Sequence, residues 1–499
     1  MVKENKIYKQ EKGSKKDFII KAKGNQRSEY IHKKLFRPKA EIIQKIYDYK
    51  NENEIFKRIK GKKRNNILNN KRFNYLNKNI FLKLFFIYIS KISNILLIYF
   101  FLIFFPSCLS KDLILKKLNS LSEISLKVSG EGDQYVLNEN FLRNPDQILI
   151  NGISQDSTGT NIAYNLPSGI NIIKLIWNLD LTSCSSMFKD LENIVEVDLS
   201  NFDSSQVITM DRMFFGCKKI TSIDLTNFET SLCNNMNSMF QSCELLASID
   251  LSNFDTSLVT DMGSMFYLCN ALTSLDISNF NTEIVTNMNG LFSACGNIIS
   301  LDLSNFITSE CTNMGFMFYG CNKLESLNIN SFDTSKVTFM KRMFSYCNEL
   351  KSLNLKHFNT DLVTNTIGMF EDCRTLKFLD LSSFRTSSLV NMEDMFKGCN
   401  SLISLNINNF DLSSVVTMSN IFKDCNSLIS LDLRVFNNFN SGTTTNCENI
   451  FLNCHESLRY CFTNSDVVEI NNQLSGFSNN NCLDACFTNL ENKFNEWFI

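Results

Sequence analysis

The sequence predicts an α/β repeat solenoid, in which short coils stack with a parallel sheet on one face and a row of short helices on the other. The main observation is an apolar pair ending in Phe that recurs every 26 residues without an insertion. A spacing kept so strictly means that each unit sits in the same geometric relation to the next, as in a solenoid. The first residues of these pairs are Met187, Met213, Met239, Met265, Leu291, Met317, Met343, Met369, Met395, Ile421 and, less regularly, Ile450.

The second observation is that each unit carries two apolar patterns. In the unit after Cys243, Ile249 and Leu251 alternate with Asp250, which is the period of a strand. In the following segment, Val259 is the first of five apolar residues spaced three, three, one and three apart, which predicts a short helix. A Gly precedes the closing Cys in some units, where a left-handed turn would end that helix.

Residues 1–83 form a basic N-terminal segment. They hold 25 Lys and Arg against 8 Asp and Glu, a net charge of +17, whereas residues 84–499 hold 25 against 43, a net charge of −18. The segment is rich in Lys and Asn without a sustained period, so we expect it to be mostly disordered and cytoplasmic. Contact with anionic membrane headgroups is the next interpretation. We expect no nucleic-acid partner, because "KGKKR" is a single short cluster.

Residues 84–106 form a 23-residue apolar stretch, LFFIYISKISNILLIYFFLIFFP, with one charge at Lys91. At about 1.5 Å per residue, a helix of this length crosses a hydrocarbon core roughly 30 Å thick. The basic flank predicts a cytoplasmic N-terminus, so that the chain is a single-pass cell-membrane protein with its repeats outside. The alternatives are a signal segment that is cleaved, which gives a secreted protein, and a buried core helix.

Three further regions follow along the chain. Residues 107–186 lack the repeat and contain alternating apolar residues, which predicts a linker and a β-rich N-terminal cap. Residues 187–439 hold the repeats. Residues 440–499 lose the period and are predicted to form a C-terminal cap. Caps are expected because no single coil of a solenoid buries its own apolar face.

The repeat resembles a known family. The stretch "LTSLDISNFNTEIVTNMNGLF", residues 272–292, and its neighbours look like the 26-residue leucine-rich repeat of the BspA type, found in surface proteins of bacteria and microbial eukaryotes. The resemblance covers about residues 187–454. It implies a leucine-rich-repeat solenoid at the cell surface, with adhesion or partner binding as its role. Phe254 and its equivalents stand where the commonest leucine-rich consensus has Asn, so an asparagine ladder is not assumed there.

Nine cysteines recur with the same period, and three roles are open to them: disulfides, metal binding and core packing. Stacked coils would place neighbouring Cα atoms about 5 Å apart, within the roughly 4.4–6.8 Å that a disulfide accepts. Equivalent side chains point in parallel, which argues against disulfides, and no His lies near them to complete a zinc site. Cys233 and Cys311 replace Val in another column, so the chain uses Cys as a small buried hydrophobe. We therefore expect core packing and no metal at Cys217, Cys243, Cys269, Cys295, Cys321, Cys347, Cys373, Cys399 and Cys425.

The cysteines near the C-terminus have irregular spacing. The predicted compartment outside the cell is oxidising, so these residues are disulfide candidates whose connectivity stays open. The candidates are Cys447, Cys454, Cys461, Cys482 and Cys486.

One polar residue lies between the two inward residues of each predicted strand, and together these residues form a row of seven Asp and three Asn. Like charges on adjacent strands repel, so the row favours binding of a cationic partner or of bridging calcium ions. The alternative is that the carboxylates only solvate an exposed sheet face and prevent aggregation. The unbroken part of the row gives the candidate ligand-binding residues Asp198, Asp224, Asp250, Asp276 and Asp302.

No enzyme signature is found in the sequence. It holds no G-x-S-x-G, phosphate loop or H-E-x-x-H motif, and the Asp row lacks the paired, desolvated carboxylates of general acid–base catalysis. We therefore expect no catalytic residues and no cofactor. The sequence predicts a surface protein that binds a protein or another surface macromolecule through its solenoid face. The alternatives are a structural coat protein that assembles with itself and a calcium-dependent binding module.

Overall fold

The computed structural model describes residues 122–157, 163–435, 446–461, 472–476 and 478–479. The chain divides into two compact units, residues 1–114 and 115–499, and every described residue belongs to the second. The predicted basic segment, residues 1–83, and the predicted membrane-crossing stretch, residues 84–106, lie outside the described residues. Within the described part of the chain, no helix is both long enough and apolar enough to span a bilayer.

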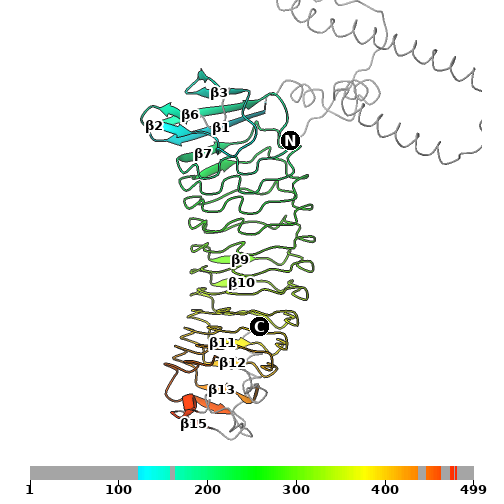
Figure 1. Ribbon diagram of the computed structural model, residues 1–499, viewed down its shortest axis with the longest axis vertical. Coiled ribbons are helices and arrows are strands. Elements are labelled where there is room, and N and C mark those ends of the chain that lie inside the picture. The colour runs from blue at the N-terminus through cyan, green and yellow to red at the C-terminus, as the bar shows by residue number, and fades with distance from the viewer. Residues whose placement is uncertain (1–121, 158–162, 436–445, 462–471, 477, 480–499) are drawn as a thin grey trace, which may run out of the picture. The chain divides into compact units, whose positions relative to one another are not determined.

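A group of strands precedes the repeats and covers their first coil (Figure 1). Alternation of apolar and polar residues produces these strands: in β1, Ile124, Leu126 and Val128 are buried and the residues between them are more exposed. The strands are β1 (Ser122–Ser129), β2 (Gly132–Tyr135), β3 (Gln147–Ile150), β4 (Ile153–Gln155), β5 (Ala163–Leu166) and β6 (Ile170–Trp177).

The repeats contribute short parallel strands at the position that the sequence pattern predicts. Residues exactly one repeat apart face each other, as Leu301 faces Leu327 and Leu379 faces Leu405. The strands are β7 (Ile194–Asp198), β8 (Ser222–Asp224), β9 (Ser300–Asp302), β10 (Ser326–Asn328), β11 (Phe378–Asp380), β12 (Ser404–Asn406), β13 (Ser430–Asp432), β14 (Arg459–Cys461) and β15 (Ser478–Asn479).

Strand β7 joins the cap to the stack. In the sheet order β4-β3-β6-β1-β7-β8, it pairs antiparallel with β1 and parallel with β8. The chain therefore changes from antiparallel to parallel pairing at this strand, and each later coil stacks on the one before it (Figure 1). The parallel pairing continues at the far end, where β13, β14 and β15 are neighbours.

The predicted row of short helices is wrong, because residues 182–433 contain no helix. The segment that carries the apolar pair consists of successive turns. In one coil, the N–H of Met213 donates to the carbonyl of Met210 at 3.2 Å, and the N–H of Phe214 donates to Met239 in the next coil at 2.9 Å. Since alternate N–H groups bond to the next coil, the continuous ladder of an α-helix cannot form. The repeats therefore build a β-solenoid.

Backbone conformation gives the second reason for the missing helices. Each turn segment contains two residues with positive φ, one directly before the apolar pair and one directly before the closing Cys. In the coil of Met213 these are Arg212, with φ of 54°, and Gly216, with φ of 74°. Two residues in the left-handed conformation, four positions apart, prevent the segment from forming a right-handed helix. The spacing of three, three, one and three thus arises from a chain of turns.

The core of the stack consists of columns of identical side chains. Phe188, Phe214 and their equivalents are fully buried and stack from coil to coil, with ring centroids 5.6 Å apart at this first pair. A second column runs through Phe202 and Phe228, whose centroids are 6.2 Å apart. Each coil therefore buries its aromatic faces against its neighbours, which is why the repeat stabilises itself only as an array.

Candidate functional site

The predicted Asp row lies on one face of the stack, and the structure places its residues one per coil. Asp198, Asp224, Asp250, Asp276 and Asp302 are all exposed. Their carboxylates follow one another at the spacing of the coils, about 4.8 Å per parallel strand. The row therefore presents an unbroken series of five negative charges to solvent.

Each Asp of the row also has a structural task. The Oδ1 atom of Asp250 accepts a hydrogen bond of 2.9 Å from the N–H of Ser252, and Asp276 accepts one of 3.1 Å from Ser278 in the same way. These Asx turns end the strand segment of each coil. The hydrogen bonds from the backbone N–H groups of Ser252 and Ser278 lower the pKa of Asp250 and Asp276 below the ordinary value. Both carboxylates therefore stay ionised at neutral pH.

The later part of the row is less negative and less exposed. Asn328 donates to Asp302 and Asn406 donates to Asp380, both at 2.9 Å, so amides replace carboxylates and relieve the repulsion between neighbours. Asp380 is only 8% exposed, and Asp432, which is 5% exposed, forms an ion pair with Arg434. Within the row, the exposed carboxylates are thus confined to the first half of the repeats.

A buried Thr column links the coils next to this row, and the sequence pattern did not reveal its role. The hydroxyl of Thr256 accepts from the N–H of Asn281 and donates to the carbonyl of the same residue, both at 2.8 Å. The signal was present in the sequence as a Thr two residues after seven successive Phe residues of the second column, from Phe228 to Phe384. The other members are Thr230, Thr282, Thr308, Thr334, Thr360 and Thr386, each at most 3% exposed.

An asparagine ladder exists, although not at the Phe position of the repeat. The Asn directly before that Phe bonds to carbonyl groups of the preceding coil: Asn279 Nδ2 donates to Leu251 at 3.0 Å and to Phe254 at 2.8 Å. Asn305 makes the equivalent bonds to Ile277 and Phe280. The Asn that forms the ladder therefore stands one residue before the position at which the commonest leucine-rich consensus has it. Its hydrogen bonds hold neighbouring coils together.

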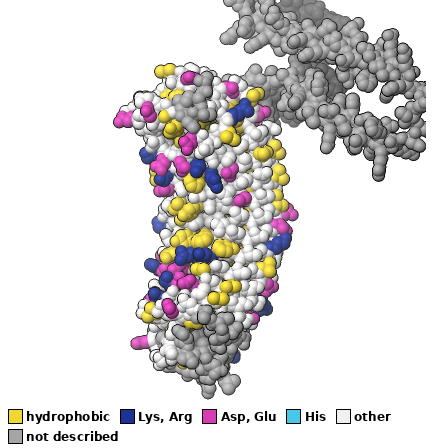
Figure 2. Space-filling view, viewed as in Figure 1, with side chains coloured by type: hydrophobic (Ala, Val, Ile, Leu, Met, Phe, Trp, Pro, Cys, Tyr) yellow, Lys and Arg dark blue, Asp and Glu magenta, His cyan; other side chains and the backbone are white. Residues whose placement is uncertain are grey.

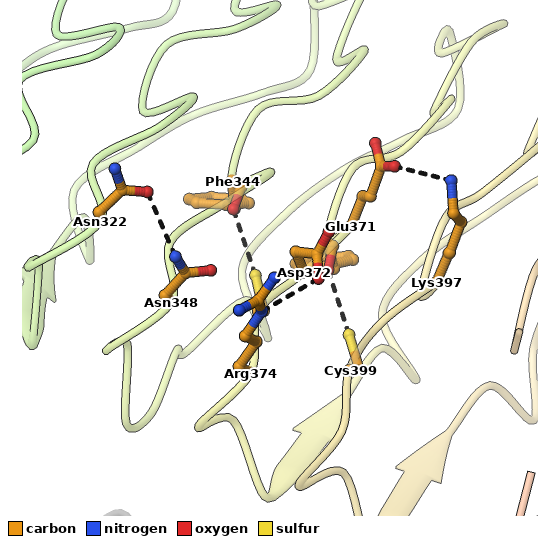
Figure 3. A network of polar contacts seen from close by, with 10 residues as sticks. Asn322, Phe344, Asn348, Glu371, Asp372, Arg374, Lys397 and Cys399 are labelled. Carbon is orange, nitrogen blue, oxygen red and sulfur yellow. Dashed lines mark hydrogen bonds and ion pairs between the residues drawn. The ribbon is translucent and has the colours of Figure 1, made fainter. Parts of the chain in front are cut away.

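The cysteine column is a ladder of buried thiols. Each Sγ–H donates to the carbonyl of the Phe in the apolar pair of the preceding coil; Cys399, for example, donates to Phe370 at 3.1 Å (Figure 3). All nine periodic cysteines are 0% exposed and carry free thiols. Burial raises the pKa of these thiols, to about 12 for Cys269 and Cys321. Such thiols are packed and unreactive rather than nucleophilic.

The C-terminal cysteines fall into two groups. Cys454 extends the ladder, because its Sγ donates to the carbonyl of Phe422 at 3.2 Å. Cys447 is buried, at 4% exposure. Cys482 and Cys486 lie outside the described residues, as does the side chain of Cys461. The predicted disulfides among these five residues stay predictions.

A charged cluster that the sequence did not reveal lies on the turn segments of the late coils. Glu371 is 2% exposed, yet its carboxylate lies 3.1 Å from Lys397 Nζ and 3.3 Å from Arg342 Nη2 (Figure 3). Lys397 also lies 3.5 Å from Asp394. Burial alone would lower the pKa of Lys397, but its hydrogen bond to Glu371 and the charge of Asp394 raise it above the ordinary value. The cluster ties three consecutive coils together.

Comparison with known proteins identifies the repeats. The model of a family described as "Mycoplasma protein of unknown function, DUF285" matches residues 182–300, 269–377 and 366–488, which together span more than half of the chain. The chain belongs to this family. A comparison with curated proteins found no match.

A solved structure is also similar to these DUF285 repeats. It is the crystal structure of a leucine-rich cell surface protein from Faecalibacterium prausnitzii, with 16% sequence identity and a TM-score of 0.27. The match covers 57% of this chain and 78% of that one. The DUF285 match begins at residue 182, so the strands β1 to β6 precede the family region.

Proposed function

We propose that the chain is a non-catalytic cell-surface repeat protein of the BspA type that binds a cationic partner protein through the face bearing Asp198 to Asp302. The observation that carries the proposal is the unbroken, exposed row of five carboxylates. The carboxylates are exposed and evenly spaced, so positive side chains of a partner can pair with them along several coils. Support for surface display comes from the resemblance of the repeat and from the apolar stretch at residues 84–106.

The Asp row is tested with fluorescent oligolysine of about 20 residues as the cationic probe, added to cells that display the full chain. We expect saturable binding that weakens with salt, because exposed charges are screened. The variant Asp250→Asn with Asp276→Asn should bind several-fold more weakly. The matched control is Asp255→Asn with Asp333→Asn, which removes the same charge from another exposed column with the same turn geometry. An equal loss in both variants would contradict the proposal.

The predicted topology is tested separately with an epitope tag at each end of the chain. Protease added to intact cells should remove the C-terminal tag and leave the N-terminal tag, if residues 84–106 are retained as a single-pass anchor. Release of the repeats into the medium would indicate the secreted alternative. A protected C-terminal tag would overturn surface display as a whole.

Two alternative functions have their own measurements. A coat protein should assemble as its concentration rises without any ligand, which light scattering detects. A calcium-dependent module should melt at a lower temperature after a chelator is added, because bound ions stabilise the folded state. Within the described residues, His, Cys, Asp and Glu side chains do not gather in groups of three suited to a metal ion. Any calcium would thus have to bridge two neighbouring carboxylates.

A further inference from the structure

A cluster of aromatic side chains lies on the turn segments, in a column away from the Asp row. The ring of Phe316 meets that of Tyr319 edge to face at 5.9 Å, and Tyr319 meets Tyr346 of the next coil at 5.5 Å. The ring of Phe339 lies over Gly315, the residue before Phe316, since a Cβ on Gly315 would be 2.5 Å from that ring. All four rings are partly exposed. We call Phe316, Tyr319, Phe339 and Tyr346, together with Tyr267, the aromatic edge.

The aromatic edge alternates with small residues along the stack. Tyr267 and Tyr319 occupy the same column two coils apart, about 10 Å at the spacing of parallel strands, and Ser293 occupies the coil between them. Ser293 is 4% exposed, so it forms a low point between two rings. The edge thus presents ring, gap and ring in a line parallel to the axis of the stack.

The edge is also uncharged over three coils. The turn segments 262–268, 288–294 and 314–320 contain no Asp, Glu, Lys or Arg. The first charges follow in the next coil, where Lys341 lies over the Phe316 ring at 5.9 Å. Figure 2 shows hydrophobic side chains gathered beside Lys and Arg side chains midway along the described stack, with Asp and Glu side chains next to them. The three uncharged segments present rings, hydroxyls and amides, which suit a ligand without charge, whereas Lys341 and Arg342 border the edge in the next coil.

A buried polar group at this edge lacks a partner. The hydroxyl of Ser345 lies one coil beyond Tyr319 in the same column, is 0% exposed, and has no hydrogen-bond partner among the described residues. Because Ser345 is fully buried, its hydroxyl belongs to the packing beneath the edge and does not face a surface ligand.

We propose that the aromatic edge binds an uncharged, linear glycan that lies along the stack. Pyranose rings offer an apolar C–H face that packs on Tyr and Phe, and hydroxyl groups that donate to and accept from Ser and Asn side chains. The repeating rings match a polymer with a repeating unit, whereas a polypeptide partner of mixed charge would leave its charged side chains unpaired against the uncharged segments 262–268, 288–294 and 314–320. This site is separate from the Asp row and does not rest on it.

The test uses the full chain in phosphatidylcholine nanodiscs, because detergents with sugar headgroups would compete. The probes are four linear neutral oligosaccharides: cellopentaose, chitopentaose, maltopentaose and laminaripentaose. Saturation-transfer NMR and calorimetry should show saturable binding of at least one. Tyr319→Ser should weaken that binding at least about fivefold, since one aromatic stacking contact is lost. Ser stands in the same column in the neighbouring coils, so this change is compatible with the fold.

Controls separate this site from the others. Tyr135→Ser removes an exposed ring, 48% exposed, from strand β2 of the cap, and should leave binding unchanged. Asp250→Asn with Asp276→Asn should also leave it unchanged, so that this proposal and the Asp row proposal can fail independently. The glycan proposal is overturned by an absence of binding to all four probes or by equal binding of the Tyr319→Ser variant.

Discussion

At the scale of the residue, the buried Thr column shows how one hydroxyl joins two coils. Thr282 is 1% exposed, and its hydroxyl both accepts from the N–H and donates to the carbonyl of Ile307, each at 2.8 Å. Thr therefore satisfies two backbone groups that would otherwise be buried without partners. A β-branched residue of the same shape without the hydroxyl would fill the space and leave both groups unpaired.

The first prediction follows from this geometry. Thr282→Val should lower the free energy of unfolding by about 1–3 kcal/mol, because it leaves buried backbone groups of Ile307 without partners. Thr260→Val is the matched control: its hydroxyl donates to Asn234 at 3.2 Å from an exposed position, where water replaces it. Urea unfolding followed by circular dichroism measures both. Equal destabilisation of the two variants would refute the assignment.

The second prediction concerns the thiol ladder. The thiol of Cys321 donates to the carbonyl of Phe292 at 3.2 Å. Its backbone N–H donates separately to the carbonyl of Phe318 in the same turn, so a side-chain substitution leaves that bond in place. Cys321→Ala should therefore destabilise the stack by about 1–2 kcal/mol through a lost contact and a small cavity. Cys321→Ser keeps a donor at this site and should cost less than Ala. If Ser proved the more damaging change, the sulfur would act through packing alone.

At the scale of the element, the turn segments decide the fold. Two left-handed residues in each segment direct alternate N–H groups to the neighbouring coil, and this pattern replaces the helix that the apolar spacing predicts. Non-Gly residues occupy many of these positions, at a steric cost of roughly 1–2 kcal/mol each. Interactions between coils must offset that cost in every unit.

The third prediction tests the left-handed position. Ala294 has φ of 55° and is equivalent to Gly320, with φ of 70°. Ala294→Gly should raise the stability by roughly 0.5–1.5 kcal/mol, because Gly adopts this conformation without strain. Ala271→Gly, two residues after Cys269 at a position without positive φ, should lower it instead. Thermal melts of the two variants should shift in opposite directions.

The strand of each repeat was predictable from its alternation, and the turn segment was not. Ile249 and Leu251 flank an exposed Asp250, as period two requires, and Leu251 is 1% exposed. The turn segment has the same apolar spacing as an amphipathic helix, so periodicity alone cannot separate the two. The available clue was Gly in two columns, at Gly290 and Gly368 before the apolar pair and at Gly216, Gly320 and Gly398 before the Cys.

The candidate sites were predictable to different degrees for a physical reason. A row repeated in every coil is visible in the sequence, which is why Asp198 to Asp302 could be placed together in advance. The aromatic edge combines different columns, and Phe316, Tyr319 and Tyr346 meet only when the turns are folded. Glu371 was hidden for the same reason, because its partners Arg342 and Lys397 come from the coils on either side.

At the scale of the whole molecule, the buried thiols predict how stability depends on pH. Their ordinary pKa is 9.0, and burial raises it to about 11 for Cys233 and Cys311 and to about 12 for Cys269. Above pH 9 the unfolded chain releases thiol protons that the folded chain retains. The unfolded state then binds fewer protons, so the free energy of unfolding falls as pH rises from 9 towards 12.

The fourth prediction puts this effect into a melting experiment under reducing conditions. The melting temperature should fall steadily between pH 9 and pH 11, because the free energy of unfolding falls by up to about 1.4 kcal/mol per thiol and pH unit. The variant Cys233→Val with Cys311→Val removes two of these thiols from a column where Val is the usual residue. Its melting temperature should fall less steeply with pH. Identical slopes would mean that other groups control the alkaline transition.

The strict 26-residue register has a consequence for how such a protein can change its length. Each column of hydrogen bonds continues through any coil that carries the same residues at the same positions. Duplication or loss of one whole unit would therefore move the far end by one coil, about 4.8 Å, and keep every column intact. A gain of residues keeps the columns only where the extra residues lie outside them: Thr417 pairs with Asn446, and Phe422 stacks on Phe451, although each pair is 29 residues apart. Unequal exchange between whole repeats of a gene would thus change the length of the stack in steps of one coil.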